Sequence, residues 1–233
     1  MDSAELIKLI KTRRSIRSFQ DKPVPEALLM QAVETATWAP NGGNAQNWRF
    51  FIILDKKVMN AIADAIDANL DLMMSWPEMA QAGPPPRSNL LRRTLALIVV
   101  TTARSLQSTD DLYAKLTQPD PNRKPGFGAL QDVVIAKRAK NDPKAKEMFD
   151  GIQIVNGRIQ STSAAVAYLL LVLHQMGLGT LWMTGPLHAK ADIEKALKLP
   201  AGLDVVTMIP VGYPAESPTK DRKPVSEVCQ VMK

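Results

Sequence analysis

The sequence predicts a single α+β domain in which a small β-sheet is flanked by helices. Short β-branched runs, such as residues 95–102, alternate with long helical patterns, of which the longest covers residues 156–176. With 233 residues, 45% hydrophobic and 22% charged side chains, the chain has enough apolar material for one large core. Because no internal repeat is present, we expect one domain over residues 1–233.

The N-terminal elements follow from local patterns. Apolar residues recur at helical spacing in residues 3–12, which predicts a first helix. Pro25 suits the first turn of a second helix over residues 26–38, and Pro40 cannot continue that helix. The aromatic and β-branched run at residues 48–54 then predicts a buried strand.

The rest of the chain has equally local signals. Residues 77–90 contain three consecutive prolines, which exclude a regular helix or a central strand. The helix at 156–176 contains a stretch, 164–173, that is apolar almost all round, so we expect this helix inside a core or a subunit interface. Residues 225–231 alternate weakly, which favours a strand-like C-terminal arm at about 214–233. Further helices are predicted at 56–75, 129–149 and 190–198, and strands at 95–102, 180–183 and 205–211.

An insertion at about 67–135 is the predicted lid of the molecule. Its segment 105–128 is polar and interrupted by Pro and Gly, and long connections of this kind often bind ligands. Aromatic and basic side chains within it would suit a flat or anionic substrate, although each also fits a packing or solvated position. These substrate candidates are Trp76, Tyr113, Lys124 and Phe127.

Composition narrows the function classes. The net charge of +6 comes from scattered basic residues, which indicate a solvated surface or steering of an anionic ligand and argue against nucleic acid as a partner. A single cysteine, Cys229, and two histidines outside metal-ligand spacing predict no disulfide framework and no metal site. No apolar run reaches about 18 residues and the N-terminus is acidic, so we expect a cytoplasmic protein without a membrane partner.

Two short segments near the start contain residue types that suit a phosphorylated ligand. Residues 13–17 read Arg-Arg-Ser-Ile-Arg, and guanidinium forks match phosphate oxygens. The same arginines could simply complement the negative end of the first helix. Residues 41–47 hold four primary amides around two glycines, and such groups suit the carbonyls and ring nitrogens of a flavin. A plain turn would explain the Asn and Gly residues but not Gln46.

Two later segments add glycine-rich and basic elements. Residues 177–186 read Gly-Leu-Gly-Thr-Leu-Trp-Met-Thr-Gly-Pro, in which glycine allows close approach of the backbone to a ligand. Residues 209–214 read Ile-Pro-Val-Gly-Tyr-Pro, and an Asp-Arg-Lys-Pro run follows at 221–224. A helix cap followed by a strand, and a solvated tail, are the simpler interpretations of these two segments.

Taken in this order, the four segments resemble the FMN-dependent nitroreductase superfamily, including its iodotyrosine-deiodinase-like branch. The resemblance covers residues of about 5–55 and 155–228. It implies a nitroreductase-like fold with a small mixed sheet, and an intertwined homodimer with two FMN molecules at its interface. The helical segment 160–176 matches the central dimer helix of that superfamily.

The resemblance also implies which residues hold the cofactor. Segment 13–17 is expected at the phosphate, ribityl chain and pyrimidine edge, and Arg222 at the phosphate. The loop around Asn41 and Asn44 is expected against the flavin of the other subunit, and residues 183–185 at flavin N5. The full set is Arg13, Arg14, Ser15, Arg17, Pro40, Asn41, Gly42, Asn44, Gln46, Met183, Thr184, Gly185 and Arg222.

The activity implied is ping-pong hydride transfer from NAD(P)H through the flavin to a small electron-poor acceptor, such as a nitroaromatic or a quinone. The redox chemistry belongs to the cofactor, so no catalytic side chain is expected. Thr184, Gly185 and Arg17 would tune the flavin, since a cation near N1 stabilises its reduced state.

Some features depart from this pattern and leave alternatives open. Asn47 stands where family members often have proline, and residues 67–135 show no convincing set of the Glu, Tyr and Lys with which the deiodinase branch grips its substrate. For this reason, reductive dehalogenation or dehydrogenation of a specific aromatic metabolite is the alternative and not the main interpretation. A more remote one is a non-enzymatic protein that binds phosphate or nucleic acid.

Overall fold

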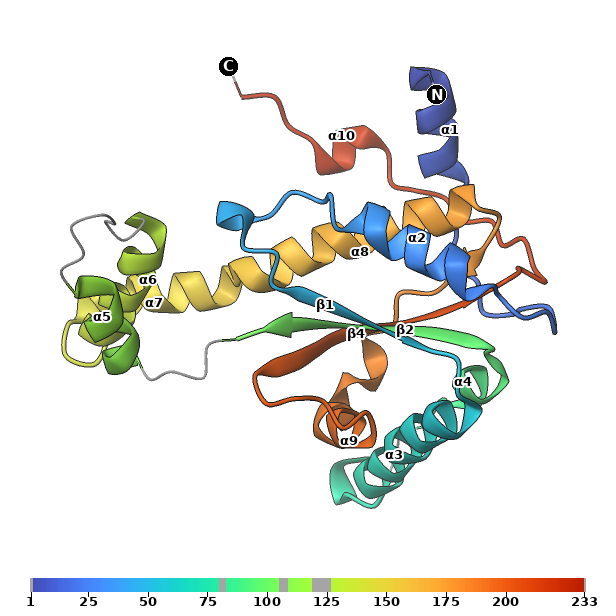
Figure 1. Cartoon of the computed structure of the whole chain (residues 1–233), viewed down its shortest axis with the longest axis horizontal. Coiled ribbons are helices and arrows are strands. Elements are labelled where there is room, and N and C mark those ends of the chain that lie inside the picture. Colours follow the sequence, from blue (N-terminus) through green and yellow to red (C-terminus); the bar gives the residue numbers. More distant parts are fainter. Residues whose placement is uncertain (1, 80–82, 105–108, 119–126, 233) are drawn as a thin grey trace.

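A four-stranded sheet with helices on both faces organises the chain (Figure 1). The computed structural model describes residues 2–79, 83–104, 109–118 and 127–232. The strand order is β1-β2-β4-β3 and every ladder between these strands is antiparallel. A parallel pairing enters only as an isolated bridge between Ser15 and Thr180 among the described residues. The strands are β1 (Trp48–Ile53), β2 (Ala96–Ala103), β3 (Gly179–Thr180) and β4 (Leu203–Gly212).

Two cores lie on opposite faces of the sheet. Side chains alternate along a strand, so Ile98 and Val100 of β2 pack beneath α2 (Glu26–Ala36) and α8 (Gly157–Gln175). Leu97 and Val99 face the other way, toward α3 (Lys56–Met74) and α9 (Lys190–Ala196). The α+β fold class with a small sheet between helices is thus confirmed, and most predicted element boundaries agree within two residues.

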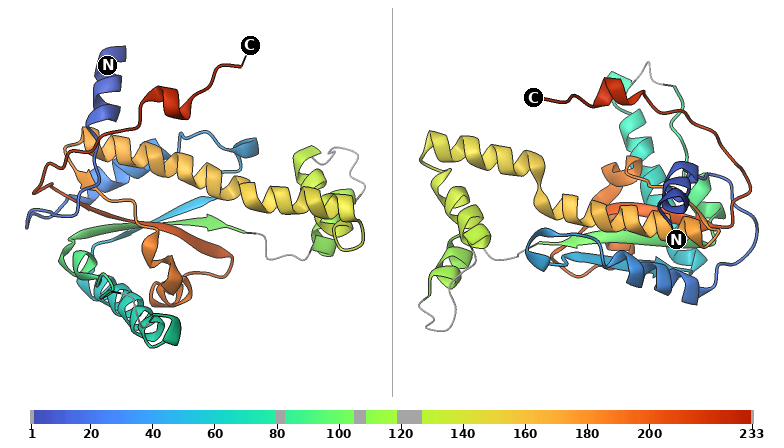
Figure 2. Two further views of the ribbon diagram at one scale, coloured as in Figure 1. Left: turned by 180° about the vertical axis from the view of Figure 1, so that it is seen from behind. Right: turned by 90° about the horizontal axis from the view of Figure 1, so that it is seen from above.

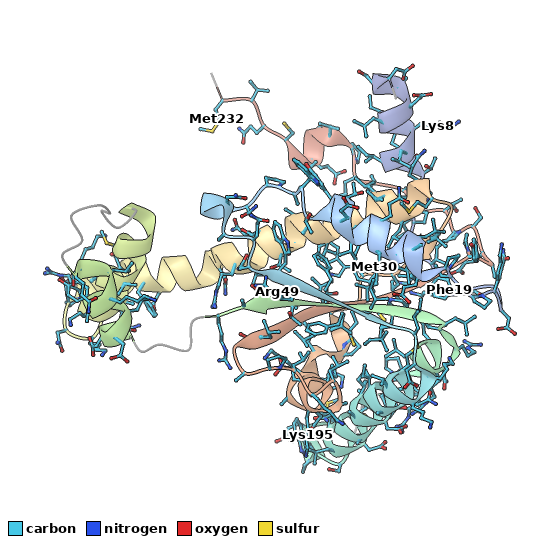
Figure 3. All side chains as sticks on the ribbon, in the orientation of Figure 1. Lys8, Phe19, Met30, Arg49, Lys195 and Met232 are labelled. Carbon is cyan, nitrogen blue, oxygen red and sulfur yellow. The ribbon has the colours of Figure 1, made fainter. Side chains whose placement is uncertain are left out.

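The N-terminal helix and the C-terminal tail both extend away from the sheet, as the positions of Lys8 and Met232 show (Figure 3). Helix α1 (Ser3–Thr12) starts with a capping box of Asp2 and Glu5 but buries none of its residues. The tail contains a short helix, α10 (Val225–Val228), so the strand-like reading of residues 225–231 is wrong. Among the described residues no strand pairs with this segment.

The predicted insertion at 67–135 has the wrong boundaries, because it includes β2, a central buried strand. The segment that leaves the core is α5 (Thr109–Thr117), α6 (Phe127–Arg138) and α7 (Pro143–Val155), which pack on one another at one end of α8 (Figure 2). The single helix predicted at 129–149 is two helices, because Pro143 begins a new one.

The remaining elements are short connectors. They are α4 (Asn89–Arg93) and three 3-10 turns, η1 (Gly42–Asn44), η2 (Pro77–Met79) and η3 (Gly185–Ala189). The predicted strand at 180–183 has only two ladder residues, and Met183 continues it through a bridge to Met208. None of the helices in the described ranges is long and apolar enough to cross a membrane.

Helix α8 is buried on one side only within the chain. Leu169, Leu170 and Leu173 face the core, whereas Ala167 and Tyr168 are exposed. The sequence predicted burial on all sides, in a core or a subunit interface. Within the single chain, the core covers one side of α8 and leaves the side with Ala167 and Tyr168 exposed.

Candidate functional site

An open pocket lies where the ends of α1 and α8 meet β3 and the C-terminal tail. Its volume of about 190 Å³ is below the 300–1,000 Å³ typical of sites that enclose a cofactor-sized ligand. The chain therefore surrounds only part of such a ligand. The lining residues that matter below are Thr12, Arg13, Arg14, His174, Gly179 and Glu216.

The arginine-rich segment reaches this pocket because it is attached to β3. The Ile16 N–H donates to the Thr180 carbonyl at 2.9 Å, beside the bridge that joins Ser15 to Thr180. Ile16 is buried against Gly179, where a Cβ atom would lie only 2.8 Å from Ile16 Cγ1. Only glycine at this position allows the segment to lie so close to the strand.

The pocket concentrates positive charge, and the carboxylate of Glu216, which also lines it, accepts backbone N–H groups instead. Burial lowers the pKa of Arg13, and the nearby Arg222 and Arg14 guanidiniums lower it further. Arg14 donates through Nη1 to the Lys11 and Arg13 carbonyls at 2.6 and 2.8 Å, but its buried Nε has no partner among the described residues. An unpaired donor and mutually repelling cations are what a bound anion would stabilise.

Glu216 joins the tail to the same segment, a role that no sequence pattern indicated. Its carboxylate Oε1 accepts the backbone N–H of Arg17 and, at 2.9 Å, that of Ser18. The Arg17 side chain itself is exposed. This contact brings residue 216 next to residue 17 and so places the tail beside the pocket.

His174 also belongs to the pocket, although sequence reasoning had considered it only as a metal ligand. Its Nε2 lies 3.0 Å from Thr12 Oγ1. Burial and the charges of Arg13 and Arg14 lower its pKa. No cluster of three or more His, Cys, Asp or Glu residues that could hold a metal occurs within the described ranges.

The segment after β3 leads away from the pocket toward Thr184 and Gly185. Met183 exchanges backbone hydrogen bonds with Met208 at 2.9 and 3.2 Å, so the backbone runs extended alongside β4. Thr184 lies four positions beyond Thr180, a distance of about 13 Å in extended chain. Thr184 and Gly185 are exposed at the start of η3.

The amide-rich loop is shaped by its own side chains. Asn41 Oδ1 accepts the Gln46 N–H at 3.0 Å, and Gln46 Nε2 donates to Asn44 Oδ1 at 3.1 Å. Gly43, Asn44 and Gln46 all have positive φ, at 60°, 52° and 44°. Such strain in non-glycine residues clusters at functional sites. Pro40 and Gly42 are exposed on the same loop.

The two segments predicted from the start of the sequence are far apart within one chain (Figure 1). The Gly42 N–H contacts Ser161 Oγ at 3.4 Å near the start of α8, whereas Thr12 contacts His174 at its end. Ser161 and His174 are thirteen positions apart in this helix, a rise of about 20 Å. The amide loop and the arginine pocket therefore do not form one site in a single chain.

The substrate candidates from the predicted lid do not come together either. Trp76 follows α3 beneath the sheet, whereas Tyr113 lies on α5 at the far end of α8, where Lys137 Nζ is 4.8 Å from its ring centre (Figure 1). Phe127 begins α6. Lys124 lies outside the described residues.

Comparison with known proteins identifies relatives over most of the chain. A family model described as nitroreductase family matches residues 10–213. An iodotyrosine dehalogenase 1 homolog of Caenorhabditis elegans is 26% identical over 228 residues, which cover 95% of this chain and 59% of that protein. The chain thus spans less than two thirds of that relative. A candidate NADH dehydrogenase/NAD(P)H nitroreductase of Methanothermobacter thermautotrophicus is 25% identical over 93% of this chain and 82% of its own length.

A solved structure supports the fold. The structure of a BluB-like flavoprotein from Clostridium difficile 630 matches with a TM-score of 0.74 at 24% sequence identity, and the match covers all of both chains. At that identity the match shows that the fold is shared.

Proposed function

The chain belongs to the nitroreductase family, and on this premise we propose that it is an FMN-dependent oxidoreductase. In this proposal it takes hydride from NAD(P)H and passes it to a nitroaromatic, a quinone or a similar electron-poor acceptor. The observation that carries the proposal is the cationic pocket, in which Arg13 has a depressed pKa and the buried Arg14 Nε lacks a partner.

The residues present fit a terminal phosphate. Arg13 and Arg14 supply donors at the end of α1, and Arg222 of the tail is close enough to lower the pKa of Arg13. A phosphate dianion would offset this repulsion and provide an acceptor for Arg14 Nε. Riboflavin has no such phosphate, so a flavoprotein fold combined with this pocket favours the mononucleotide.

The rest of the cofactor would extend from the phosphate along residues 180–185. The distance of about 13 Å from Thr180 to Thr184 would be covered by the ribityl chain together with the adjoining part of the flavin ring, and the ribityl chain would contact Ser15. Thr184 and Gly185 then offer exposed backbone groups to the ring, and Arg17 offers a cation. When bound, FMN supplies the hydride chemistry, whereas the chain binds it, orients it and adjusts its electrostatics.

A second copy of the chain would complete this site as a homodimer. The 190 Å³ pocket is too small to enclose the cofactor. The loop with Pro40, Asn41, Gly42, Asn44 and Gln46 lies about 20 Å from it along α8. In a dimer this loop would cover the partner's flavin. Exposed apolar residues on α1, on α8 and in the tail provide the contact surface, among them Leu6, Ile7, Ile10, Tyr168, Val225, Val228 and Met232.

The cofactor and activity can be tested on the purified protein. We expect a yellow protein that releases FMN on denaturation, is bleached by NADH or NADPH without oxygen, and regains its colour when a nitroaromatic or quinone is added. A colourless protein that does not bind added FMN would contradict the proposal.

Reductive dehalogenation is a second candidate, favoured by the similarity to an iodotyrosine dehalogenase homolog. It predicts tight binding of a halogenated aromatic amino acid and slow turnover of generic nitro compounds, so the same anaerobic acceptor screen separates the two activities. The non-enzymatic alternative predicts instead nucleic-acid affinity that falls steeply with salt, without a bound chromophore.

The dimer is tested by Tyr168→Lys on the exposed face of α8. A charge buried at an interface without a partner is costly, so we expect a shift from dimer to monomer in sedimentation. The affinity for FMN should fall at least tenfold, because the dimer completes the site. Leu72→Lys is the matched control, because Leu72 is 57% exposed on α3, on the opposite face of the sheet. An unchanged dimer in the Tyr168 variant would exclude this face as the interface.

A further inference from the structure

The arginine pocket contains an ionisable group that the proposed function does not use, the imidazole of His174. We propose that His174 is a third cationic partner of the cofactor's terminal phosphate and takes up one proton when the phosphate binds. The inference rests on the proposed function, because it requires FMN or another phosphate monoester as the ligand.

The hydrogen bonds around His174 define which nitrogen is available. The Thr12 hydroxyl donates to the Lys8 carbonyl at 2.8 Å, so its oxygen is free to accept. His174 Nε2, at 3.0 Å, is then the donor to Thr12 Oγ1. In the neutral ring this leaves Nδ1 with a lone pair and with no hydrogen-bond partner in the described part of the chain. His174 lines the pocket, so Nδ1 is the atom that can gain a proton there.

The charges around His174 come from three elements. Arg13 and Arg14 face it from the end of α1, and together with burial they lower its pKa. Glu216 lines the same pocket from the tail, where Arg222 lies near Arg13. The C-terminal end of α8, in whose last turn His174 lies, favours a cation. In the free protein, burial and the two arginines outweigh the effect of the helix end and lower the pKa of His174, so its ring is neutral at pH 7.

A bound phosphate would reverse this balance. The dianion would neutralise the field of Arg13 and Arg14 and add negative charge near Nδ1, so the imidazolium becomes the favoured form. The pKa of His174 is then higher in the complex than in the free protein. The extra affinity is complete below the free pKa and is lost as the pH rises through the bound pKa. Each unit of pKa difference corresponds to tenfold in affinity.

The first test follows the protonation of His174 directly. The chain has two histidines, so in His188→Gln protein with ¹⁵N-labelled histidine both ring-nitrogen resonances belong to His174. We expect the pKa from its NMR titration to rise by at least one unit when FMN is added to the cofactor-free, full-length protein. Riboflavin, which lacks the phosphate, should leave it unchanged. An unchanged pKa with FMN bound would overturn the inference.

The second test compares FMN affinity across pH in the wild type and in His174→Gln. Glutamine retains an N–H for Thr12 Oγ1 but cannot take up a proton. We expect the wild-type advantage to grow severalfold as the pH falls from 8 to 6, because the full tenfold for each unit of pKa difference is reached only below the free pKa. Parallel curves would overturn the inference. In that case FMN binding, and with it the proposed function, would remain. If neither protein binds FMN at any pH, both proposals fail, and if the variant does not fold, the NMR titration decides.

Discussion

Replacing Arg13 with alanine is expected to weaken FMN binding by about 10- to 150-fold, because a hydrogen bond to a charged group contributes about 1.5–3 kcal/mol. The cofactor-free protein should keep its stability or gain slightly. Burial lowers the pKa of Arg13, and repulsion by Arg222 and Arg14 lowers it further, so removing this guanidinium relieves both costs. Opposite effects on binding and on stability are typical of a binding residue.

The measurements are FMN fluorescence titration and melting temperatures with and without FMN. Arg93→Ala is the control, since Arg93 is an exposed arginine on α4, far along the chain from the pocket. We expect FMN to raise the melting temperature of the wild type and of the control, and to have little effect on that of the Arg13 variant. Normal affinity in the Arg13 variant would refute the phosphate assignment.

Gly179→Ala should both destabilise the fold and disrupt the pocket. The added Cβ would lie 2.8 Å from Ile16 Cγ1 and 3.0 Å from Ile16 Cβ, and a buried β-branched side chain has few other rotamers. We expect a loss of about 1–3 kcal/mol in the free energy of unfolding. The arginine segment must also move away from β3, so FMN affinity should fall as well. Urea unfolding at one fixed protein concentration measures the first effect.

Gly157→Ala is the matched control, because a Cβ there meets no atom within 4 Å. A second check combines Gly179→Ala with Ile16→Ala, which removes both Cγ atoms from the clash. If the clash is the cause, the double variant loses less stability than the two single variants together, since contacting residues are not additive. Strictly additive losses would point to another origin.

Most of the secondary structure could be predicted because it depends on local patterns. Apolar spacing located α1, α2, α3 and α8, and β-branched runs located β1, β2 and β4. The failures have equally local causes. Pro143 was not recognised as the start of a helix, and the weak alternation at 225–231 belongs to a tail that pairs with no strand in the described part of the chain. The lid boundaries were wrong because β2 lies within them.

The candidate site was only partly predictable. The arginines and the Met183–Gly185 segment carry recognisable residue types, and their order resembles that of the family to which the chain belongs. Glu216 and His174 carry no such signal, because each reaches the pocket through a contact with a distant residue. Glu216 meets the backbone of Arg17 across 199 positions, and His174 meets Thr12 across 162.

The sequence by itself therefore determined the fold class, the main elements and the residue types that suit a phosphorylated cofactor. These are properties of short segments, whose spacing and composition set local conformation and donor chemistry. The tertiary structure alone decided that the ends of α1 and α8, β3 and the tail share one pocket, and that the amide loop lies about 20 Å from it along α8. Only the packing of the whole chain brings positions that are distant in the sequence together, or separates segments that are close in the sequence.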